Sequence, residues 1–334
     1  MALAINYKIQ IENKELTSYF HERFLSLTIK DWGGKQSDEA ILIFDDRPYP
    51  TPDTSLSVPG CGASLDVFLG HRNELIGMGQ YIIDDRVLIG QPDGQFLKIY
   101  AKGLNVVSSF LSLKTRSWVS QEGGPPMTLG TIISQIAQEH SMIPKVSEKL
   151  SQISIIQENQ TRESDSNFLM RLAKKYGALF KPRGKNLVFA SFTESMSIEG
   201  KKFPTSLLGP ANVYNWRVTF AERNKFTQVQ AFWYDYQENK LKMIKVGTEG
   251  KVFQLRHQYS CENETLYAAE SYLKKLSMQT EHLECRIPGN PELLAEHQVS
   301  LAGFKEIVNG RWTLSSVTHK VNSKDYVTTF QAYR

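Results

Sequence analysis

Several side chains in this sequence have spacings that could serve a reaction, beginning with a serine and a lysine near the C-terminal third. Ser271 and Lys274 have the S-x-x-K spacing that supplies a nucleophilic serine and its lysine in one class of acyl-transfer enzymes. The S-D-N and K-T-G elements that accompany this motif in those enzymes are absent from the sequence. The motif also lies in an amphipathic helical segment. We therefore expect both residues to be ordinary helix residues.

A second group could suggest a metal site. His282, Glu284, Cys285 and His297 fall within a short stretch, but their spacings match no standard zinc pattern. Glu284 and Cys285 are adjacent, so on a strand they point to opposite faces. His319 lies within an alternating segment, which indicates a buried, hydrogen-bonded histidine of a barrel. We expect no metal ligand among these residues.

Two adjacent carboxylate pairs, Asp45–Asp46 and Asp84–Asp85, raise the question of glycoside hydrolysis. Glycosidases need two carboxyl groups that face each other across a cleft. Neighbouring residues at strand ends do not face each other, and Asp is a frequent turn residue. We therefore expect turns at both pairs.

The glycine-rich motifs do not favour cofactor binding, and the first of them is better explained as a turn. Gly60-Cys61-Gly62 and Gly77-Met78-Gly79 have G-x-G spacing, but neither opens a strand–turn–helix unit, so neither is a dinucleotide loop. Cys61 has no histidine nearby in sequence. Nothing in the chain combines a nucleophile, a base and an oxyanion site. We predict that the protein is not an enzyme, with no catalytic, cofactor-binding or metal-binding residue and no cofactor.

Residues 163–190 contain hydroxyl and carboxyl groups that could form a catalytic patch, but a helix and a hairpin account for them better. Ser164 or Asp165 stands where a helix N-cap belongs, and Gly177 suits a left-handed C-terminal position. Residues 182–185 form the expected hairpin turn between two strands. The predicted buried stripe consists of Phe168, Leu169, Leu172, Ala173 and Tyr176.

Composition describes a globular chain. The 334 residues are 41% hydrophobic and 22% charged, and the net charge is +4. Basic and acidic residues are interspersed, which does not favour specific nucleic-acid binding. No apolar run reaches the roughly 18 residues of a membrane span, so we expect no membrane insertion. The sequence shows no signal peptide, and three widely spaced cysteines indicate a reducing compartment during synthesis.

The elements that position these residues are mostly strands. Residues 3–115 contain short alternating segments separated by turns, which is typical of a small barrel or sandwich. The composition changes at residues 116–128, which we interpret as a linker or long loop. A helix capped by Thr128 and the helix and hairpin described above then form an α+β unit. Strands return from Val213, and one helix is expected at Glu264–Met278, with Leu266, Ala269, Tyr272, Leu273 and Leu276 on its buried side.

With these segments laid out, the chain resembles the phage late control D protein family, the baseplate hub proteins of contractile-tailed phages. It is also similar to the hub portion of the type VI secretion spike protein VgrG. The resemblance lies in the order and spacing of several stretches across nearly the whole chain. They are HERFLSLTIKDWGGKQSDEAILIFDD (21–46), VPGCGASLDVFLG (58–70), GQYIIDDRVLIGQPDGQFLKIYAKG (79–103), KTRSW (114–118), TLGTIISQIAQEH (128–140), QENQT with residues 163–190, IPGNPELLAEHQVSLAGF (287–304) and WTLSSVTHKV (312–321).

The resemblance implies an α+β, mostly β fold in which two tail-tube-like β-barrel domains flank a small α+β domain. The first barrel would be residues 1–118. The α+β domain would be 119–205 together with an insertion at roughly 250–282. The second barrel would be 206–249 and 283–334.

The resemblance also implies a structural role and partners. Three copies would place six barrels in a ring, which joins the six-fold tail tube to the three-fold spike. The implied partners are two further copies of the chain, the tail spike protein, the tail tube protein or a tube-initiating baseplate protein, and the tape-measure protein. The implied location is the tail baseplate of a virion, assembled in the bacterial cytoplasm. The alternative is a hub that also binds or hydrolyses cell-wall glycan.

Overall fold

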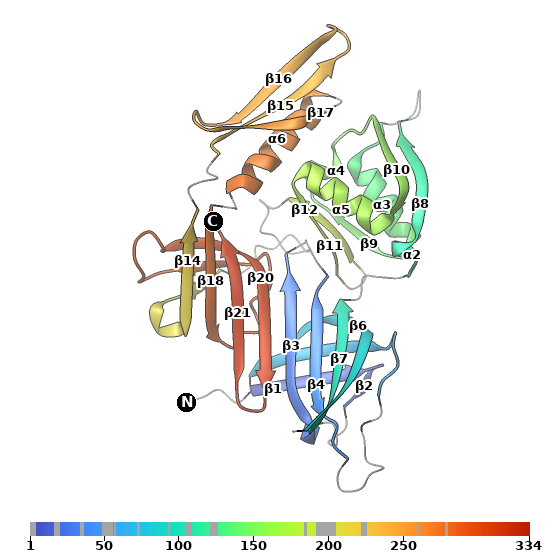
Figure 1. The fold of residues 1–334 in the computed structure, drawn as a ribbon. Helices are drawn as coiled ribbons and strands as arrows, with labels where there is room; N and C mark the ends of the chain where they lie inside the picture. Colours follow the sequence, from blue (N-terminus) through green and yellow to red (C-terminus); the bar gives the residue numbers. More distant parts are fainter. Residues whose placement is uncertain are drawn as a thin grey trace. The chain divides into compact units, whose positions relative to one another are not determined.

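The computed structural model describes residues 5–16, 21–33, 37–48, 56, 58–71, 74–92, 94–103, 108–120, 126–183, 186–191, 205–221, 226–259, 261–277 and 280–334 (Figure 1). The protein is α+β, and strands predominate. It divides into two compact units. Unit 1 comprises Met1–Asn105, Pro204–Arg217 and Leu283–Ala332, and unit 2 comprises Val106–Phe203, Val218–His282 and Tyr333–Arg334.

Unit 1 is built on a 13-stranded sheet with the order β14-β18-β21-β20-β3-β4-β7-β6-β5-β1-β2, to which β19 and β13 are added beside β20. The strands of the first part are β1 Ile5–Ile11, β2 Lys14–Glu15, β3 Phe24–Trp32, β4 Glu39–Asp45, β5 Ser64–His71, β6 Glu74–Gln91 and β7 Gly94–Gly103. The others are β13 Ser206–Leu208, β14 Asn215–Phe220, β18 Glu281–Pro288, β19 Gln298–Leu301, β20 Gly310–Asn322 and β21 Tyr326–Tyr333; a 3-10 turn spans Pro210–Asn212.

The first seven strands enclose one hydrophobic core. Alternate residues of β3, β4 and β5 are buried, as the period of two in the sequence predicts. Ile9 of β1 and Leu65 of β5 share this core with Leu42 of β4 and Leu97 of β7. The sheet therefore curls over its own core, and Figure 1 shows β1 crossing the direction of β3 and β4. Within the region where the sequence predicts short strands, β6 is a single long strand with a bulge between Ile83 and Asp85.

Unit 2 begins with the small α+β part. Its elements are α2 Ser108–Leu111, β8 Leu113–Val119, α3 Leu129–Glu139, β9 Ile143–Val146, α4 Glu148–Ser151, β10 Gln157–Ser164, α5 Asp165–Tyr176, β11 Ala178–Arg183 and β12 Asn186–Ser191. Strands β8 and β10 form one antiparallel ribbon, and β11, β12 and β9 form a three-stranded sheet. Residues 116–119, predicted to belong to a linker, are part of β8. Gly184 and Lys185 of the expected hairpin turn lie outside the described residues.

Helices α3 and α5 lie where their capping residues and apolar stripes predicted them. Thr128 caps α3 by accepting a hydrogen bond from the Thr131 amide. Ser164 caps α5 by accepting one from the Asn167 amide, and Gly177 ends the helix with φ +57°. The whole predicted stripe of α5 is buried in a core with the apolar face of α3. These two helices therefore form the rigid centre of unit 2.

The second part of unit 2 is a separate small module. It consists of β15 Gln228–Asp235, β16 Lys240–Gly247, β17 Val252–Tyr259 and α6 Glu262–Ser277. The three strands form their own sheet in the order β16-β15-β17. The resemblance implied a second barrel that includes residues 206–249, whereas β15 and β16 join β17 in a separate sheet that packs against α6. The buried side of α6 also differs from the prediction, because Thr265 and Ala268 are buried and Leu266 is exposed.

None of the helices in the described part of the chain combines the length and the hydropathy that a membrane crossing requires.

Candidate functional site

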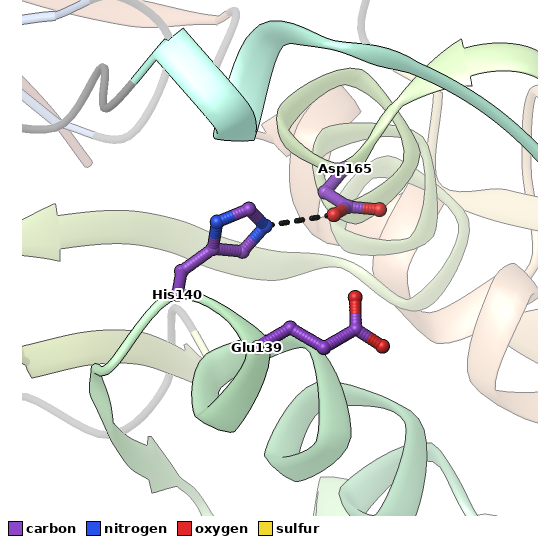
Figure 2. A group of neighbouring side chains, drawn as sticks. All are labelled: Glu139, His140 and Asp165. Carbon is purple, nitrogen blue, oxygen red and sulfur yellow. Dashed lines mark hydrogen bonds and ion pairs between the residues drawn. The ribbon is translucent and has the colours of Figure 1, made fainter.

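One buried group of charges in unit 2 is centred on Asp165, whose side chain has no exposed surface. Lys114 Nζ donates to Asp165 Oδ2 at 2.6 Å, and Arg116 Nη2 donates to Oδ1 at 2.7 Å. Gln160 Nε2 donates to Oδ1 at 2.8 Å. His140 Nε2 lies 2.8 Å from Oδ2, and this contact is drawn in Figure 2. The carboxylate therefore has four hydrogen-bonding partners from three other elements or their ends.

Glu139 extends this arrangement at the end of α3. Its carboxylate accepts hydrogen bonds from Lys114 Nζ at 2.9 Å and from Arg116 Nη1 at 2.7 and 2.9 Å. Lys114 and Arg116 thus each bridge Glu139 and Asp165. We call this group the Asp165 network; it consists of Lys114, Arg116, Glu139, His140, Gln160 and Asp165.

Simple strand and helix geometry brings the network together. Lys114, Arg116 and Trp118 alternate along β8, so all three point to the same face of the ribbon. Trp118 is buried on that face, and the Arg116 guanidinium lies 4.4 Å from the centre of its ring. The two cations are therefore held at the edge of the core, directly over the start of α5 and the end of α3.

The cations decide the ionisation of the two carboxyl groups. Burial by itself raises the pKa of Asp165, but hydrogen bonds from Lys114, Gln160 and His140 and the charge of Arg116 outweigh it, so the pKa lies below its ordinary value. The same balance between burial and the two cations lowers the pKa of Glu139. Both groups are therefore carboxylates at neutral pH, and the paired charges balance.

Glu139, His140 and Asp165 also have the ligand types of a metal site, with their ligand atoms within 4.8 Å of one another (Figure 2). The donor set argues against a divalent cation. Lys114 and Arg116 already neutralise both carboxylates, and a metal ion would lie beside two fixed positive charges. A substrate could not reach Asp165 either, because its side chain is fully buried. The arrangement is suited to joining β8, α3 and α5.

A second buried group of charges joins α6 to the α+β part. Lys175 of α5 pairs with Glu158 of β10 and with Glu264 of α6, and both glutamates are buried. Arg171 pairs with Glu158 at 3.2 Å and with Glu163 at 3.0 Å. Lys175 is therefore half-buried and joins α5, β10 and α6.

The S-x-x-K residues both lie on α6, where Ser271 is a packing residue. Ser271 faces Gly177, and a Cβ built at residue 177 would lie 2.1 Å from the Ser271 hydroxyl oxygen. Lys274 is half-buried, and burial lowers its pKa to about 8. The serine is thus occupied by helix packing, as expected for an ordinary residue of α6.

The candidate metal ligands separate as the strand geometry predicted. Cys285 is buried on one face of β18, while His282 and Glu284 are exposed on the other. Burial raises the pKa of the Cys285 thiol to about 12, so the group is a neutral thiol. His319 is fully buried, with Nε2 3.0 Å from the Leu293 carbonyl and Nδ1 2.9 Å from the Tyr326 hydroxyl. The expectation of a buried, hydrogen-bonded histidine is confirmed.

The two acidic pairs lie in different kinds of local structure. Asp45 closes a turn by accepting from the Arg47 amide at 3.0 Å, and Asp46 accepts from the Leu56 amide at 2.9 Å. Asp84 and Asp85 were predicted to form a turn, and this prediction was wrong. They lie at the bulge inside β6, where Asp84 pairs with Lys102 at 2.6 Å. Gly60-Cys61-Gly62 forms a turn, with Gly62 at φ +85°.

These observations define a class of protein: an assembly of curled and packed sheets in which, among the described residues, the Asp165 network, Lys175 and His319 form structural contacts. The chain belongs to the phage tail baseplate hub (GPD) family, whose model matches residues 108–325. A relative from Escherichia phage 186, described as a probable baseplate hub protein, is 24% identical over 98% of this chain and 92% of its own length. The role of the protein is therefore structural, as a hub of a phage tail.

Solved structures show the same fold. The 43 kDa tail protein of prophage MuSo2 from Shewanella oneidensis has a TM-score of 0.71 and 14% identity, and the match covers 99% of this chain and 98% of that one. The Escherichia coli c3393 protein, a component of the type VI secretion system, has a TM-score of 0.61 and 10% identity, over 98% of this chain and 76% of that one. The likeness to a VgrG-type hub is thus present in the fold.

Proposed function

We propose that three copies of this chain form the hub of a contractile-tail baseplate and join the six-fold tail tube to the three-fold spike. The observation that carries the proposal is the near full-length match to a probable baseplate hub protein, together with the family match over residues 108–325. The trimeric state, the tube and spike contacts and the barrel character of the sheet belong to the proposal.

The architecture of unit 1 supports two tube-like modules. One would consist of β1 to β7, which already curl over a single core. The other would consist of β13, β14 and β18 to β21, which continue the same sheet from β3 through β20. A ring of such modules needs head-to-tail contacts that close, and exposed sheet edges can supply them. Residues 119–205 and 250–282 would form the α+β part that accompanies the two modules.

The partners and the location follow from this role. The hub would bind the spike protein on one side and the tube protein, or a tube-initiating baseplate protein, on the other, with the tape-measure protein inside the tube. It would be assembled in the cytoplasm of the bacterial host and then remain in the tail baseplate of the virion. The hub itself would have no catalytic step.

Light scattering coupled to size exclusion, with the spike protein of the same tail added, tests the proposal. We expect a complex with three copies of this chain. A chain that stays monomeric and does not bind its spike would contradict it. A cell-wall digestion assay with the purified protein should show no turnover, and turnover above a heat-denatured control would support the alternative of a glycan-cleaving hub.

A further inference from the structure

The β15–β17 sheet has one face that its own module does not cover. Val229 and Ala231 of β15 and Leu255 of β17 are buried against Ala269 and Leu276 of α6. Because successive residues of a strand point to opposite faces, Phe232 and Tyr234 of β15 point away from α6. The core of the module is therefore complete without that second face.

The uncovered face carries an apolar cluster at the end of the β15–β16 hairpin. Phe232 lies opposite Met243, and Tyr234 lies opposite Leu241. The rings of Tyr234 and Tyr236 are in edge contact, with centres 5.1 Å apart. Tyr236 is 82% exposed, Leu241 51% and Met243 46%. We call these five residues the hairpin patch.

The composition of the hairpin patch is that of an interface centre. Tyr, Phe and Met are enriched in the centres of protein–protein interfaces, where Lys and Glu are depleted. Exposed apolar side chains that lie singly need no explanation, but five that are contiguous indicate an interaction site. Since α6 already buries the other face, these residues are not needed for the core of the module.

The edge strand of the sheet indicates the direction from which a partner can bind. β16 is an outer strand in the order β16-β15-β17, and it carries Lys240, Lys242 and Lys245. Lysines on an edge strand oppose the addition of another strand. A partner would therefore cover the hairpin patch from its face rather than extend the sheet.

The size of the hairpin patch and the charge beside it limit the kind of partner that it can bind. A standard interface takes about 20–30 residues from each side, and the hairpin patch has five, so it suits one small element rather than a second copy. Each strand takes up about 4.8 Å of the width of a sheet, so two strands together are about as wide as one α-helix, whose diameter is about 10 Å. Lys245 borders the patch next to Met243, and Arg256 is exposed at the bulge of β17. Lys245 thus places a positive charge at the border of the patch.

We propose that the hairpin patch docks an amphipathic α-helix of another tail protein. The apolar stripe of that helix covers Phe232, Tyr234, Tyr236, Leu241 and Met243, and acidic residues along its flank pair with Lys245. This inference rests on the hub role proposed above, because it takes the partner from the same tail.

Photocrosslinking in assembled tails tests the inference. p-Benzoylphenylalanine is placed at Met243, tails are purified from producing cells and irradiated, and the linked peptides are identified by mass spectrometry. A matched control places it at Glu249, which is exposed in the same module but lies beyond the other end of β16. We expect Met243, and not Glu249, to link to an amphipathic helical segment rich in Asp and Glu.

A pair of variants measures the importance of the contact. Leu241→Ser with Met243→Ser removes apolar area from the hairpin patch, and Val252→Ser is the control because it is exposed at the far end of the sheet. We expect at least a tenfold loss of functional tails for the double variant and less than twofold for the control, with unchanged melting temperatures for both. Lys245→Glu should also weaken the crosslink from Met243.

The outcomes separate the two proposals. Tails that contain the chain but give no crosslink from Met243, or a crosslink to a second copy of the chain, would overturn the docking inference alone. The same holds for a folded double variant with a normal yield of tails. A chain that is missing from purified tails would overturn the hub role and the docking inference together.

Discussion

Gly177 and Ser271 approach so closely that residue 177 has no room for a side chain. A Cβ at this position would lie 2.1 Å from the Ser271 Oγ and 2.4 Å from its Cβ. Gly177 also has φ +57°, a conformation that L-residues with a Cβ rarely adopt. One glycine thus ends α5 and lets α6 pack against the α+β part of unit 2, so the two parts share one contact point.

The first prediction concerns Gly177→Ala. Left-handed backbone strain costs about 1–2 kcal/mol, and overpacking against α6 adds about 1–3 kcal/mol, so we expect a loss of about 2–5 kcal/mol in the unfolding free energy of unit 2. Urea denaturation measures it. The control is the same change in a Ser271→Gly background, where the two shortest contacts, to Ser271 Oγ and Cβ, are removed and the loss should be smaller. Equal losses in both backgrounds would show that the close approach does not matter.

The second prediction separates the helix cap from the Asp165 network. Ser164→Ala removes the cap of α5 and should cost about 1 kcal/mol. Asp165→Ala leaves Lys114 and Arg116 partly buried without their shared carboxylate, and we expect about 3–5 kcal/mol, because breaking a buried ion pair leaves charges uncompensated. The midpoints of denaturant unfolding of the two variants measure and compare these two losses of stability. If Asp165→Ala proved no worse than Ser164→Ala, the network would contribute little to stability.

The helices of unit 2 could be predicted from the sequence because their signals are local. Ser164, the stripe from Phe168 to Tyr176 and Gly177 stand within a few residues of one another, and all of them have the expected role. The buried side of α6 was predicted less well, since it includes Thr265, whose hydroxyl donates to the carbonyl of Cys261, the residue before the helix. Hydropathy alone cannot detect a buried residue of that kind.

Strand β10 and the Asp165 network could not be predicted from the same signals. The buried side of β10 carries Glu158 and Gln160 instead of apolar residues, so no alternation of hydrophobic residues marks it. The cations that neutralise Asp165 come from Lys114 and Arg116, about fifty residues earlier in the chain. One usable signal was available, because the alternation of Lys114, Arg116 and Trp118 places two cations beside a buried indole.

The third prediction concerns the stability of unit 2 in acid. The pKa values of Asp165 and Glu139 are lower in the folded protein than in the unfolded chain, where they are near 3.8 and 4.5. The unfolded chain therefore binds more protons at low pH, and the contribution of the network is present above about pH 4.5 and is lost as the pH falls through the lowered folded values.

Hydrogen exchange with mass spectrometry, followed on peptides from residues 128–176 at pH 6, 5 and 3.5, measures this loss. We expect protection to change little from pH 6 to 5 and to fall at pH 3.5. The matched control is Asp165→Asn, which cannot ionise at this position and should show a smaller change with pH. A variant with the same acid sensitivity as the unmodified protein would argue against the network as its cause.

The fourth prediction concerns His319 in unit 1. Its contribution to stability changes in a higher pH range than that of the Asp165 network. Burial lowers the pKa of this imidazole from 6.5 to about 4, although the Leu293 carbonyl and the charge of Asp31 act in the opposite direction. The unfolded chain binds a proton at a pH where the folded protein does not. Stability of unit 1 is therefore full above about pH 6.5 and is lost progressively down to about pH 4, by roughly 3 kcal/mol in all.

Urea denaturation from pH 7 to 4.5, with hydrogen exchange on peptides from residues 310–333 to assign the transition to unit 1, checks this slope. His319→Gln keeps a hydrogen-bonding side chain that does not titrate, so its stability should depend less on pH in this range, whatever its stability at pH 7. His282→Gln is the control for the loss of an exposed histidine, since His282 lies on the outer face of β18. If His319→Gln retained the full slope, the buried imidazole would not be the group that links the stability of unit 1 to pH.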